Sequence, residues 1–193
     1  MLNLPAEFVI MDTEYTVWEG SFERGWGGPN EHKEIVAIGS IKVDGPMLTE
    51  TDSQVIFVRP EKNPKLSDFF INFTHITQEM VDKNGVSLRE ALNKFSNWCD
   101  FLPIFSFGPD DKIMRANCDL ISISFPFPDN MFHDVRDVFE AQGVAMRKYT
   151  SGTILEALGE KGGRSAHNPL NDVRTILDGL RILSGRISSS KES

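Results

Sequence analysis

The sequence predicts a single α/β domain in which a mixed sheet is flanked by helices. The first observation behind this is the order of elements: three strand-like segments, then helices alternating with strands, then one long helix. The second is an ordinary composition, since 193 residues with 40% hydrophobic and 25% charged side chains can build one sizeable core. Because no repeat or linker divides the chain, we expect one domain over residues 1–185 and a flexible, serine-rich tail over residues 186–193.

Three strands are predicted in the first third of the chain. Residues 7–13 form a short apolar run that ends in an acid, which is typical of a buried strand. Residues 34–43 form the second strand and residues 51–58 the third, with a turn at Asp44-Gly45-Pro46 between them. Residues 15–33 are rich in glycine and aromatic side chains and are predicted to be a long loop or a wide hairpin tip. The opening therefore indicates an antiparallel meander.

Helical patterns dominate after the third strand. The clearest covers residues 87–101, with Ser87 as N-cap, Glu90 at the capping-box position and apolar residues on one face. The last helix begins at Asn168 as N-cap, with Pro169 in its first turn, and covers residues 170–183. The other expected elements are short helices at 66–70, 77–82, 108–117 and 151–158, a strand at 104–107, and a strand passing into a helix at 132–139.

Charge and targeting features narrow the function classes. The formal net charge of −8 argues against a wide basic groove for long duplexes, because phosphate affinity normally comes from Lys and Arg. No apolar run approaches the roughly 20 residues of a membrane span, and the first residues do not resemble a signal peptide. We therefore expect a cytoplasmic protein whose two cysteines, Cys99 and Cys118, are reduced thiols.

Asp12 and Glu14 are the first candidate functional residues. They end the first predicted strand, and residues i and i+2 of a strand share a face, so both carboxylates point the same way. Two neighbouring carboxylates repel each other unless a cation lies between them, and Mg²⁺ or Mn²⁺ takes such oxygen ligands. Taken alone, an acid-x-acid pattern is also typical of a strand that ends at the surface.

Two further motifs place acids at element ends. Asp110 and Asp111 lie at a strand-to-helix junction, where the helix dipole favours an acid whether or not it binds a metal. His167 lies just before the N-cap of the last helix and Asp172 in its first turns. A helix would hold the acid rigidly beside a more mobile histidine, which is the natural general base near neutral pH. Each motif alone is equally consistent with an ordinary surface feature.

The three motifs in this order resemble those of the DEDDh 3′→5′ exonucleases, which include RNase T, oligoribonuclease and the proofreading subunit of a replicative DNA polymerase. The resemblance spans residues 8–183. Within that superfamily the sequence is most similar to the branch of 3′-exonucleases that act on histone mRNA and small interfering RNA. The segments that carry this similarity are residues 65–70, 73–82 and 163–172.

The resemblance implies a ribonuclease-H-like fold with a mixed five-stranded sheet, and two bound divalent cations, Mg²⁺ or Mn²⁺. The implied metal ligands and catalytic acids are Asp12, Glu14, Asp111 and Asp172, with Asp110 as the alternative to Asp111. His167 would be the general base. In this scheme Asp12 bridges both cations, Glu14 and Asp172 hold the first, and the remaining acid helps to hold the second.

The resemblance also implies a pocket for the terminal nucleotide. Tyr15 and Thr16 should border that nucleotide, and Ile76 should press against its base. His75 stands where the family often has glycine, so its side chain either narrows the pocket, stacks on a base or points to solvent.

Other candidates stay open at this stage. The aromatic residues Trp18, Phe22 and Trp26 of the first loop either stack on single-stranded bases or cover the core. Asp134 is interpreted as a structural acid at a strand end. The basic residues that flank the second and third motifs are candidates for phosphate contacts: Lys112, Arg115, Lys161 and Arg164.

The expected activity is hydrolysis at nucleic-acid 3′ ends, with RNA favoured and single-stranded DNA as a second substrate. The nearest alternative is a DNA exonuclease in proofreading or repair, because motifs that act on phosphates say little about the 2′-hydroxyl. A different class of alternative is a non-catalytic binding protein that keeps the fold. The presence of all five expected side chains favours an enzyme.

Overall fold

The computed structural model describes residues 2–161, 164 and 167–191 and contains a mixed five-stranded sheet, as the sequence predicts. Gly163, Ser165 and Ala166, which belong to the predicted motif before His167, lie outside the described residues. The strands follow the spatial order β3-β2-β1-β4-β5. Their bounds are β1 Glu7–Tyr15, β2 Ile35–Asp44, β3 Thr49–Phe57, β4 Ile104–Ser106 and β5 Phe132–Asp134.

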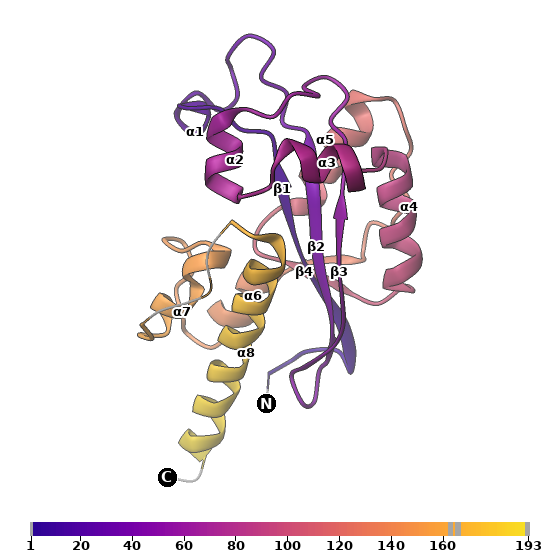
Figure 1. Cartoon of the computed structure of the whole chain (residues 1–193). Helices are drawn as coiled ribbons and strands as arrows, with labels where there is room; N and C mark the ends of the chain where they lie inside the picture. The colour runs from indigo at the N-terminus through magenta and orange to yellow at the C-terminus, as the bar shows by residue number, and fades with distance from the viewer. Residues whose placement is uncertain (1, 162–163, 165–166, 192–193) are drawn as a thin grey trace.

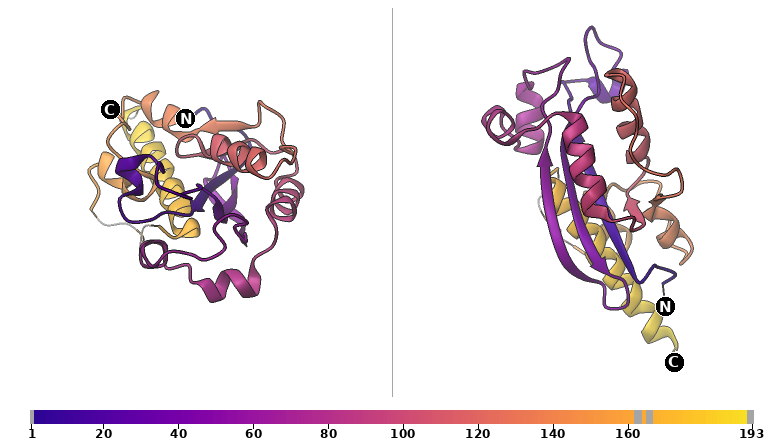
Figure 2. Two further views of the ribbon diagram at one scale, coloured as in Figure 1. Left: turned by 90° about the horizontal axis from the view of Figure 1, so that it is seen from above. Right: turned by 90° about the vertical axis from the view of Figure 1, so that its right-hand side faces the viewer.

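The first three strands form the predicted antiparallel meander, and β4 and β5 add to it in parallel. The long helix α8 (Pro169–Lys191) packs on one face of the sheet, and α4 (Leu88–Cys99) packs on the other (Figures 1 and 2). The remaining helices are α1 Ser21–Arg24, α2 Asp68–Thr74, α3 Gln78–Asn84, α5 Asp110–Leu120, α6 Val135–Glu140, the 3₁₀ turn η1 Ser151–Thr153 and α7 Ile154–Ala157.

The side chains of β1 alternate between the two cores. Phe8 and Ile10 pack in the core on the α8 side, whereas Val9 and Met11 pack in the core on the α4 side. Because strand side chains have a period of two, Asp12 and Glu14 continue the α8 face beyond the apolar part of the strand. The expectation that these two acids share a face is confirmed.

Gly39 lets the start of α8 approach the sheet beside Asp12. It is paired with Asp12 across the β1–β2 ladder, and a Cβ built on it would lie 2.5 Å from the backbone of Pro169. A side chain at this position would therefore push the helix away. Since directly paired residues of neighbouring strands face the same side, the missing side chain brings the first turn of α8 over the Asp12 carboxylate.

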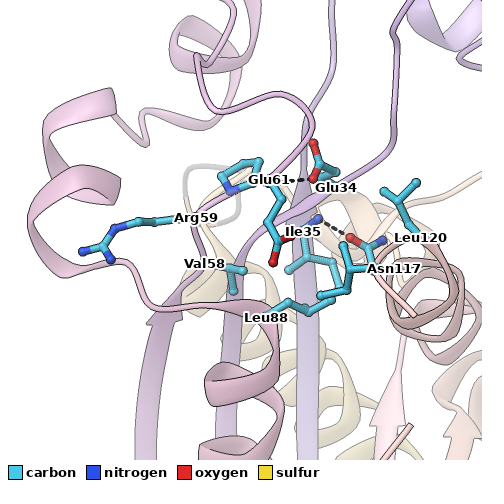
Figure 3. Close-up of a pocket in the computed structure, with 10 residues that line it drawn as sticks. Glu34, Ile35, Val58, Arg59, Glu61, Leu88, Asn117 and Leu120 are labelled. Atoms are coloured by element: carbon cyan, nitrogen blue, oxygen red, sulfur yellow. Dashed lines mark hydrogen bonds between the residues drawn. The ribbon is translucent and has the colours of Figure 1, made fainter. Parts of the chain in front are cut away.

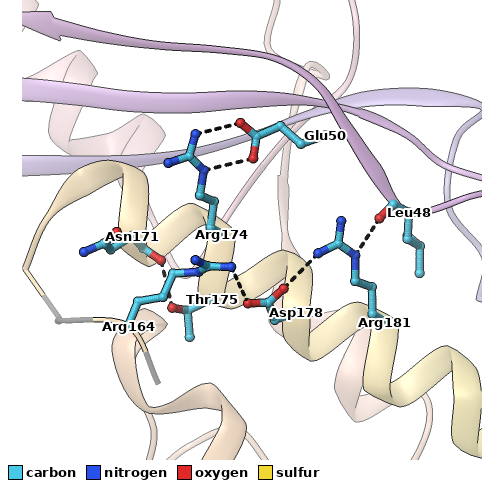
Figure 4. A network of polar contacts seen from close by, with 8 residues as sticks. All are labelled: Leu48, Glu50, Arg164, Asn171, Arg174, Thr175, Asp178 and Arg181. Carbon is cyan, nitrogen blue, oxygen red and sulfur yellow. Dashed lines mark hydrogen bonds and ion pairs between the residues drawn. The ribbon is translucent and has the colours of Figure 1, made fainter. Parts of the chain in front are cut away.

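Polar contacts along α8 fix the helix against the meander (Figure 4). The Arg174 guanidinium donates to both oxygens of Glu50 on β3, at 2.9 and 2.7 Å. About two turns further along α8, Arg181 donates to the carbonyl of Leu48 at 2.8 Å and to Asp178 at 2.9 Å. These contacts hold α8 against the sheet at two places, Arg174 and Arg181. They limit how far Asp172, in the first turns of the helix, can move.

A buried carboxylate organises the opposite end of the sheet (Figure 3). Glu34 accepts hydrogen bonds from the backbone amides of Glu61, Lys62 and Asn63, at 2.8, 2.9 and 2.6 Å. The adjacent amide of Ile35 donates to Asn117 of α5 at 2.9 Å. These contacts join the start of β2 to α5, the helix whose first residue is Asp110.

The elements differ from the predicted ones mainly at their ends. The sequence ends the last helix at Leu183, whereas α8 continues to Lys191; the flexibility of the tail stays a prediction. Cys99 and Cys118 are both buried free thiols, as expected. Within the part of the chain that the structure describes, no helix combines the length and apolar character needed to cross a bilayer.

Candidate active site

The predicted motifs converge on one pocket of about 550 Å³. It lies where β1 ends, where β4 leads into α5, and where α8 begins. Four carboxylates line it, together with His167: Asp12, Glu14, Asp110 and Asp172. The three parts of the pattern, which are far apart in the sequence, are therefore adjacent in space.

The four carboxylates strongly perturb one another. Burial, together with the charges of Asp110, Glu14 and Asp172, raises the pKa of Asp12 well above its usual value. Burial and the charges of Asp172 and Asp110 raise the pKa of Glu14 to about 8. Without a counter-charge, the Glu14 carboxyl would therefore hold a proton at neutral pH. Such a cluster is typical of a functional site rather than of a stabilising one.

The structure places Asp110, and not Asp111, in the pocket, so it favours the alternative that the sequence left open over the expected Asp111. Asp110 is buried, lines the pocket and accepts hydrogen bonds from the amide, at 3.2 Å, and the hydroxyl of Thr13. Asp111 does not line the pocket, and its carboxylate lies 4.0 Å from Nε of Arg115 one turn along the helix. Successive helical residues point about 100° apart, so only one of the two acids can face the site.

We expect Asp110→Asn and Asp111→Asn to have unequal effects on nuclease turnover. Asp110→Asn should lower turnover by roughly 10²-fold, the scale for losing a group that supports a bound metal ion. Asp111→Asn should remain within about twofold of the parent, because it removes only a partly exposed ion pair. Turnover of both variants on one oligonucleotide measures the difference. Equal losses, or a larger loss in Asp111→Asn, would contradict the assignment.

Asp172 projects from the first turns of α8 and is almost fully buried. Its pKa is raised to about 6 by burial, although the backbone N–H of His167 donates to it and opposes the shift. Within the described part of the chain, its Oδ1 atom has no hydrogen-bond partner. A buried carboxylate oxygen without a donor is costly, which indicates that a ligand completes its surroundings.

His167 approaches the acids from the loop before α8. One possible ligand atom from each of His167, Glu14 and Asp172 lies within 4.8 Å of the other two. The imidazole stacks on the ring of Phe73 of α2, with ring centroids 3.7 Å apart and an angle of 27° between the planes. Burial lowers the pKa of His167, which favours the neutral imidazole that can accept a proton.

The donor set fits divalent cations that prefer oxygen ligands. It supplies four carboxylates in one pocket, and among the described residues the Oδ1 atom of Asp172 has no hydrogen-bond partner. Hard cations such as Mg²⁺ and Mn²⁺ take this type of ligand. Cations bound here would also remove the electrostatic cost that raises the pKa values of Asp12 and Glu14.

Of the four residues expected to contact the terminal nucleotide, only Tyr15 lines the pocket. Thr16 is buried, and its hydroxyl donates to the His32 carbonyl at 2.6 Å and accepts from the Glu34 amide at 2.9 Å. Ile76 is buried in the hydrophobic cluster that α2 and α3 form with β2. His75 caps α2 in a left-handed conformation and is exposed outside the pocket. The structure therefore places Thr16, His75 and Ile76 outside the pocket lining, and their contact with a nucleotide stays a prediction.

Phe22 and Trp26 of the first loop lie in different surroundings, and base stacking by these residues stays a prediction. Trp26 has structural contacts. Its indole N–H donates to the Thr16 carbonyl at 2.8 Å, and the Lys33 ammonium lies over its ring, 3.7 Å from the centroid. Phe22 lines the pocket and is 51% exposed. Its ring lies 5.9 Å from that of Phe73, so together with Tyr15 these two rings form an aromatic wall of the pocket.

The basic residues of the pocket are not those that the sequence indicated. Arg115 pairs with Asp129 at 2.9 Å and Arg164 pairs with Asp178 at 2.8 Å, and neither lines the pocket. Lys112 and Lys161 are exposed and also lie outside the lining. Lys33 and Arg136 line it instead. No local pattern marks these two residues, since both are far from the acidic motifs in the sequence.

The sequence comparison identifies the class of protein that this fold and this cluster of acids define. Residues 9–180 match the family described as RNase T exonucleases. The chain therefore belongs to that family, and it is a 3′→5′ exonuclease, a hydrolase of phosphodiester bonds.

Two relatives and one solved structure illustrate the similarity. The probable 3′-5′ exonuclease KapD of Bacillus subtilis is 29% identical over 86% of this chain and 79% of its own length. The 3′-5′ exoribonuclease 1 of Homo sapiens is 28% identical over 86% of this chain, but the chain spans only 49% of that protein. The nuclease domain of 3′hExo, a DEDDh family member solved with rAMP, superposes with a TM-score of 0.79 at 26% identity, over 96% of this chain and 95% of that domain.

The superposition also assigns the fold. The five-stranded mixed sheet and its flanking helices form the ribonuclease-H-like fold of the DEDDh exonucleases, as the resemblance in the sequence implied.

Proposed function

We propose that this protein is a two-metal 3′→5′ exonuclease that removes single nucleotides from the 3′ end of RNA or of short single-stranded nucleic acid. One observation carries the proposal: four carboxylates and a histidine, brought from β1, α5 and the start of α8, line the same pocket. The net charge of −8 supports recognition of a chain end rather than of a long duplex.

The proposed roles follow from the position of each side chain. Asp12, Glu14, Asp110 and Asp172 would hold the cations. Two divalent cations, Mg²⁺ or Mn²⁺, would stabilise the attacking and leaving oxygens of an in-line phosphoryl displacement. His167 would accept the proton of the attacking water, because its imidazole lies beside the acids and its pKa is lowered by burial.

The reaction balances as a hydrolysis. A water oxygen forms a new bond to the phosphorus of the last internucleotide linkage while one of its protons passes to His167. The bond from that phosphorus to the 3′ oxygen of the preceding nucleotide breaks, and this oxygen leaves as a hydroxyl after taking up a proton from solvent water, while His167 returns its proton to solvent. The products are a nucleoside 5′-monophosphate and a chain that is shorter by one nucleotide.

RNA is the favoured substrate in this proposal. The support is that the human relative is an exoribonuclease and that the similar nuclease domain was solved with rAMP. The alternative is a DNA-directed exonuclease, because the acids recognise the phosphate, which RNA and DNA share.

The test compares degradation of matched RNA and DNA oligonucleotides, single- and double-stranded, in Mn²⁺ and in excess chelator. We expect 5′-mononucleotides to accumulate from single-stranded RNA fastest, and only with the cation. Equal or faster degradation of DNA would overturn the RNA preference and favour the DNA-directed alternative.

Release of nitrophenol from the 5′-nitrophenyl ester of thymidine monophosphate tests hydrolysis at a single nucleotide, without the rest of a nucleic-acid strand. This ester presents a terminal nucleotide with a good leaving group. If the intact protein releases no nitrophenol in Mn²⁺ and degrades no oligonucleotide, the protein is a non-catalytic binder and the proposal is wrong.

A further inference from the structure

Arg136 is a cation of the active-site pocket to which the reaction, as described so far, gives no role. It is the second residue of α6 and follows β5, the edge strand of the sheet. Its side chain lines the same pocket as the four carboxylates. The three residues Tyr149, Thr150 and Ser151, whose side chains carry hydroxyl groups, line it as well.

Hydrogen bonds hold the Arg136 side chain in one orientation. Asp134, the last residue of β5, accepts hydrogen bonds from the Arg136 amide at 3.0 Å, from its Nε at 2.9 Å and from its Nη2. The Gly108 amide also donates to Asp134, which lowers the pKa of that carboxyl together with the Arg136 contacts. Asp134 is thus the structural acid that the sequence indicated, and the group that it positions is Arg136.

The anchored guanidinium still has donors for a ligand. An arginine carries five N–H donors in a planar fork, and the contacts with Asp134 engage only its Nε and Nη2 groups. Among the described residues, no hydrogen-bond acceptor occupies Nη1. A planar, pre-oriented guanidinium of this kind is well suited to bind two oxygens of a phosphate group.

The guanidinium lies next to Gly108, two residues before Asp110. Its Nη2 atom is 3.6 Å from where a Cβ on Gly108 would stand, and Gly108 adopts a φ of +104° that favours glycine. Neighbouring strands lie about 4.7–4.9 Å apart, so β5 is roughly 10 Å from β1, which carries Asp12 and Glu14. Arg136 therefore comes from the β5 side of the pocket, away from the strand that carries Asp12 and Glu14, which suits contact with a phosphate next to the one under attack.

The two walls of the pocket differ in chemistry, which gives the substrate a direction. The aromatic wall of Tyr15, Phe22 and Phe73 suits the terminal base. The other side, with Arg136 and three hydroxyl groups, comes from α6 and the segment before α7, and Figure 1 shows these helices on the opposite side of the start of α8 from α1 and α2. If the last base of a nucleic-acid strand contacts the aromatic wall, the preceding nucleotides extend past the acids toward Arg136.

We propose that Arg136 binds the backbone phosphate between the second and third nucleotides from the 3′ end, one linkage upstream of the bond that is cut. This inference rests on the proposed exonuclease function and adds a specificity-determining contact to it. It makes the enzyme sensitive to the phosphate on the 5′ side of the scissile one.

The test uses dinucleotides with and without a 5′ phosphate, since this group occupies the position of the upstream phosphate and leaves the scissile linkage unchanged. For the parent protein we expect the 5′ phosphate to raise kcat/KM by about tenfold, the scale of one charge-assisted contact. In Arg136→Gln the ratio between the two dinucleotides should fall to about 1, and in Arg136→Lys it should be intermediate.

Arg115→Gln is the matched control, because Arg115 also pairs with a carboxylate but does not line the pocket. It should keep the ratio of the parent. The ratio separates binding from folding, since a general loss of structure lowers both rates together. A parent ratio near 1, an Arg136→Gln variant that keeps the parent ratio, or equal loss on both dinucleotides with the ratio retained would each overturn the inference. Absence of hydrolysis of either dinucleotide by the parent would instead contradict the proposed function.

Discussion

Asp12→Asn is expected to abolish both cation binding and nuclease activity, and to raise the thermal stability of the metal-free protein. Asp12 is surrounded by the charges of Asp110, Glu14 and Asp172, and all three raise its pKa. An amide keeps the shape of the side chain but removes the charge that the cations need. A metal ion supplies several kcal/mol of transition-state stabilisation, so turnover should fall by at least about 10³-fold.

The pKa of Asp12 is higher in the folded protein than in the unfolded chain, so at neutral pH its ionisation opposes folding. The stability associated with the protonated group is present below the unfolded pKa of about 4 and is lost as the pH rises through the raised folded value. An asparagine has no such loss. The metal-free variant should therefore melt at a higher temperature than the metal-free parent at pH 7.

Two measurements check this prediction. Calorimetric titration with Mn²⁺ should show binding to the parent and none to Asp12→Asn, and Mn²⁺ should raise the melting temperature of the parent alone. Asp111→Asn is the control, because it makes the same chemical change outside the pocket. Unchanged nuclease activity in Asp12→Asn would defeat the assignment of Asp12 as a ligand.

Residues whose positions follow from local periodicity could be predicted from the sequence. The alternation of β1 places Asp12 and Glu14 on one face, and the capping residues Asn168 and Pro169 locate the start of α8 and hence Asp172. These signals depend only on neighbouring residues, so they need no knowledge of the fold. The assembly of the three motifs into one site came from the resemblance to a family, and not from any one motif.

The choice between Asp110 and Asp111 needed the structure. Both follow the same strand, and the difference between them depends on the rotation of α5 about its axis. That rotation is fixed by distant contacts, such as the hydrogen bond from the Ile35 amide to Asn117 and the bonds from Thr13 to Asp110. No pattern within the motif contains this information.

The same limit applies to the walls of the pocket. Phe22 and Phe73 come from two helices that are joined by two strands and long connections, and their rings meet only because α1 packs beside α2. Arg136 reaches the site because Asp134 turns its guanidinium toward Gly108. Thr16 and Ile76, which were expected at the substrate, are buried just beyond the ends of β1 and α2. Side-chain direction outside regular elements is decided by packing, which the sequence does not display.

His167→Ala is expected to lower turnover by roughly 10²–10⁴-fold, the usual scale for the loss of a general base, while cation binding survives. The imidazole lies beside Glu14 and Asp172, but the four carboxylates supply the oxygen ligands that Mg²⁺ and Mn²⁺ prefer. Its ring is held by stacking on Phe73 at a centroid distance of 3.7 Å, which positions it for proton transfer without requiring a bond to a metal ion.

The experiment pairs turnover with calorimetry on the same preparation. For His167→Ala we expect slow turnover with a Mn²⁺ affinity close to that of the parent. His75→Asn is the matched control, since His75 is exposed outside the pocket and asparagine tolerates its left-handed φ of 62°. It should leave both quantities unchanged. If His167→Ala lost its Mn²⁺ affinity together with its turnover, His167 would be a ligand rather than the base, because a proton acceptor that does not touch the cations cannot change their binding by that amount.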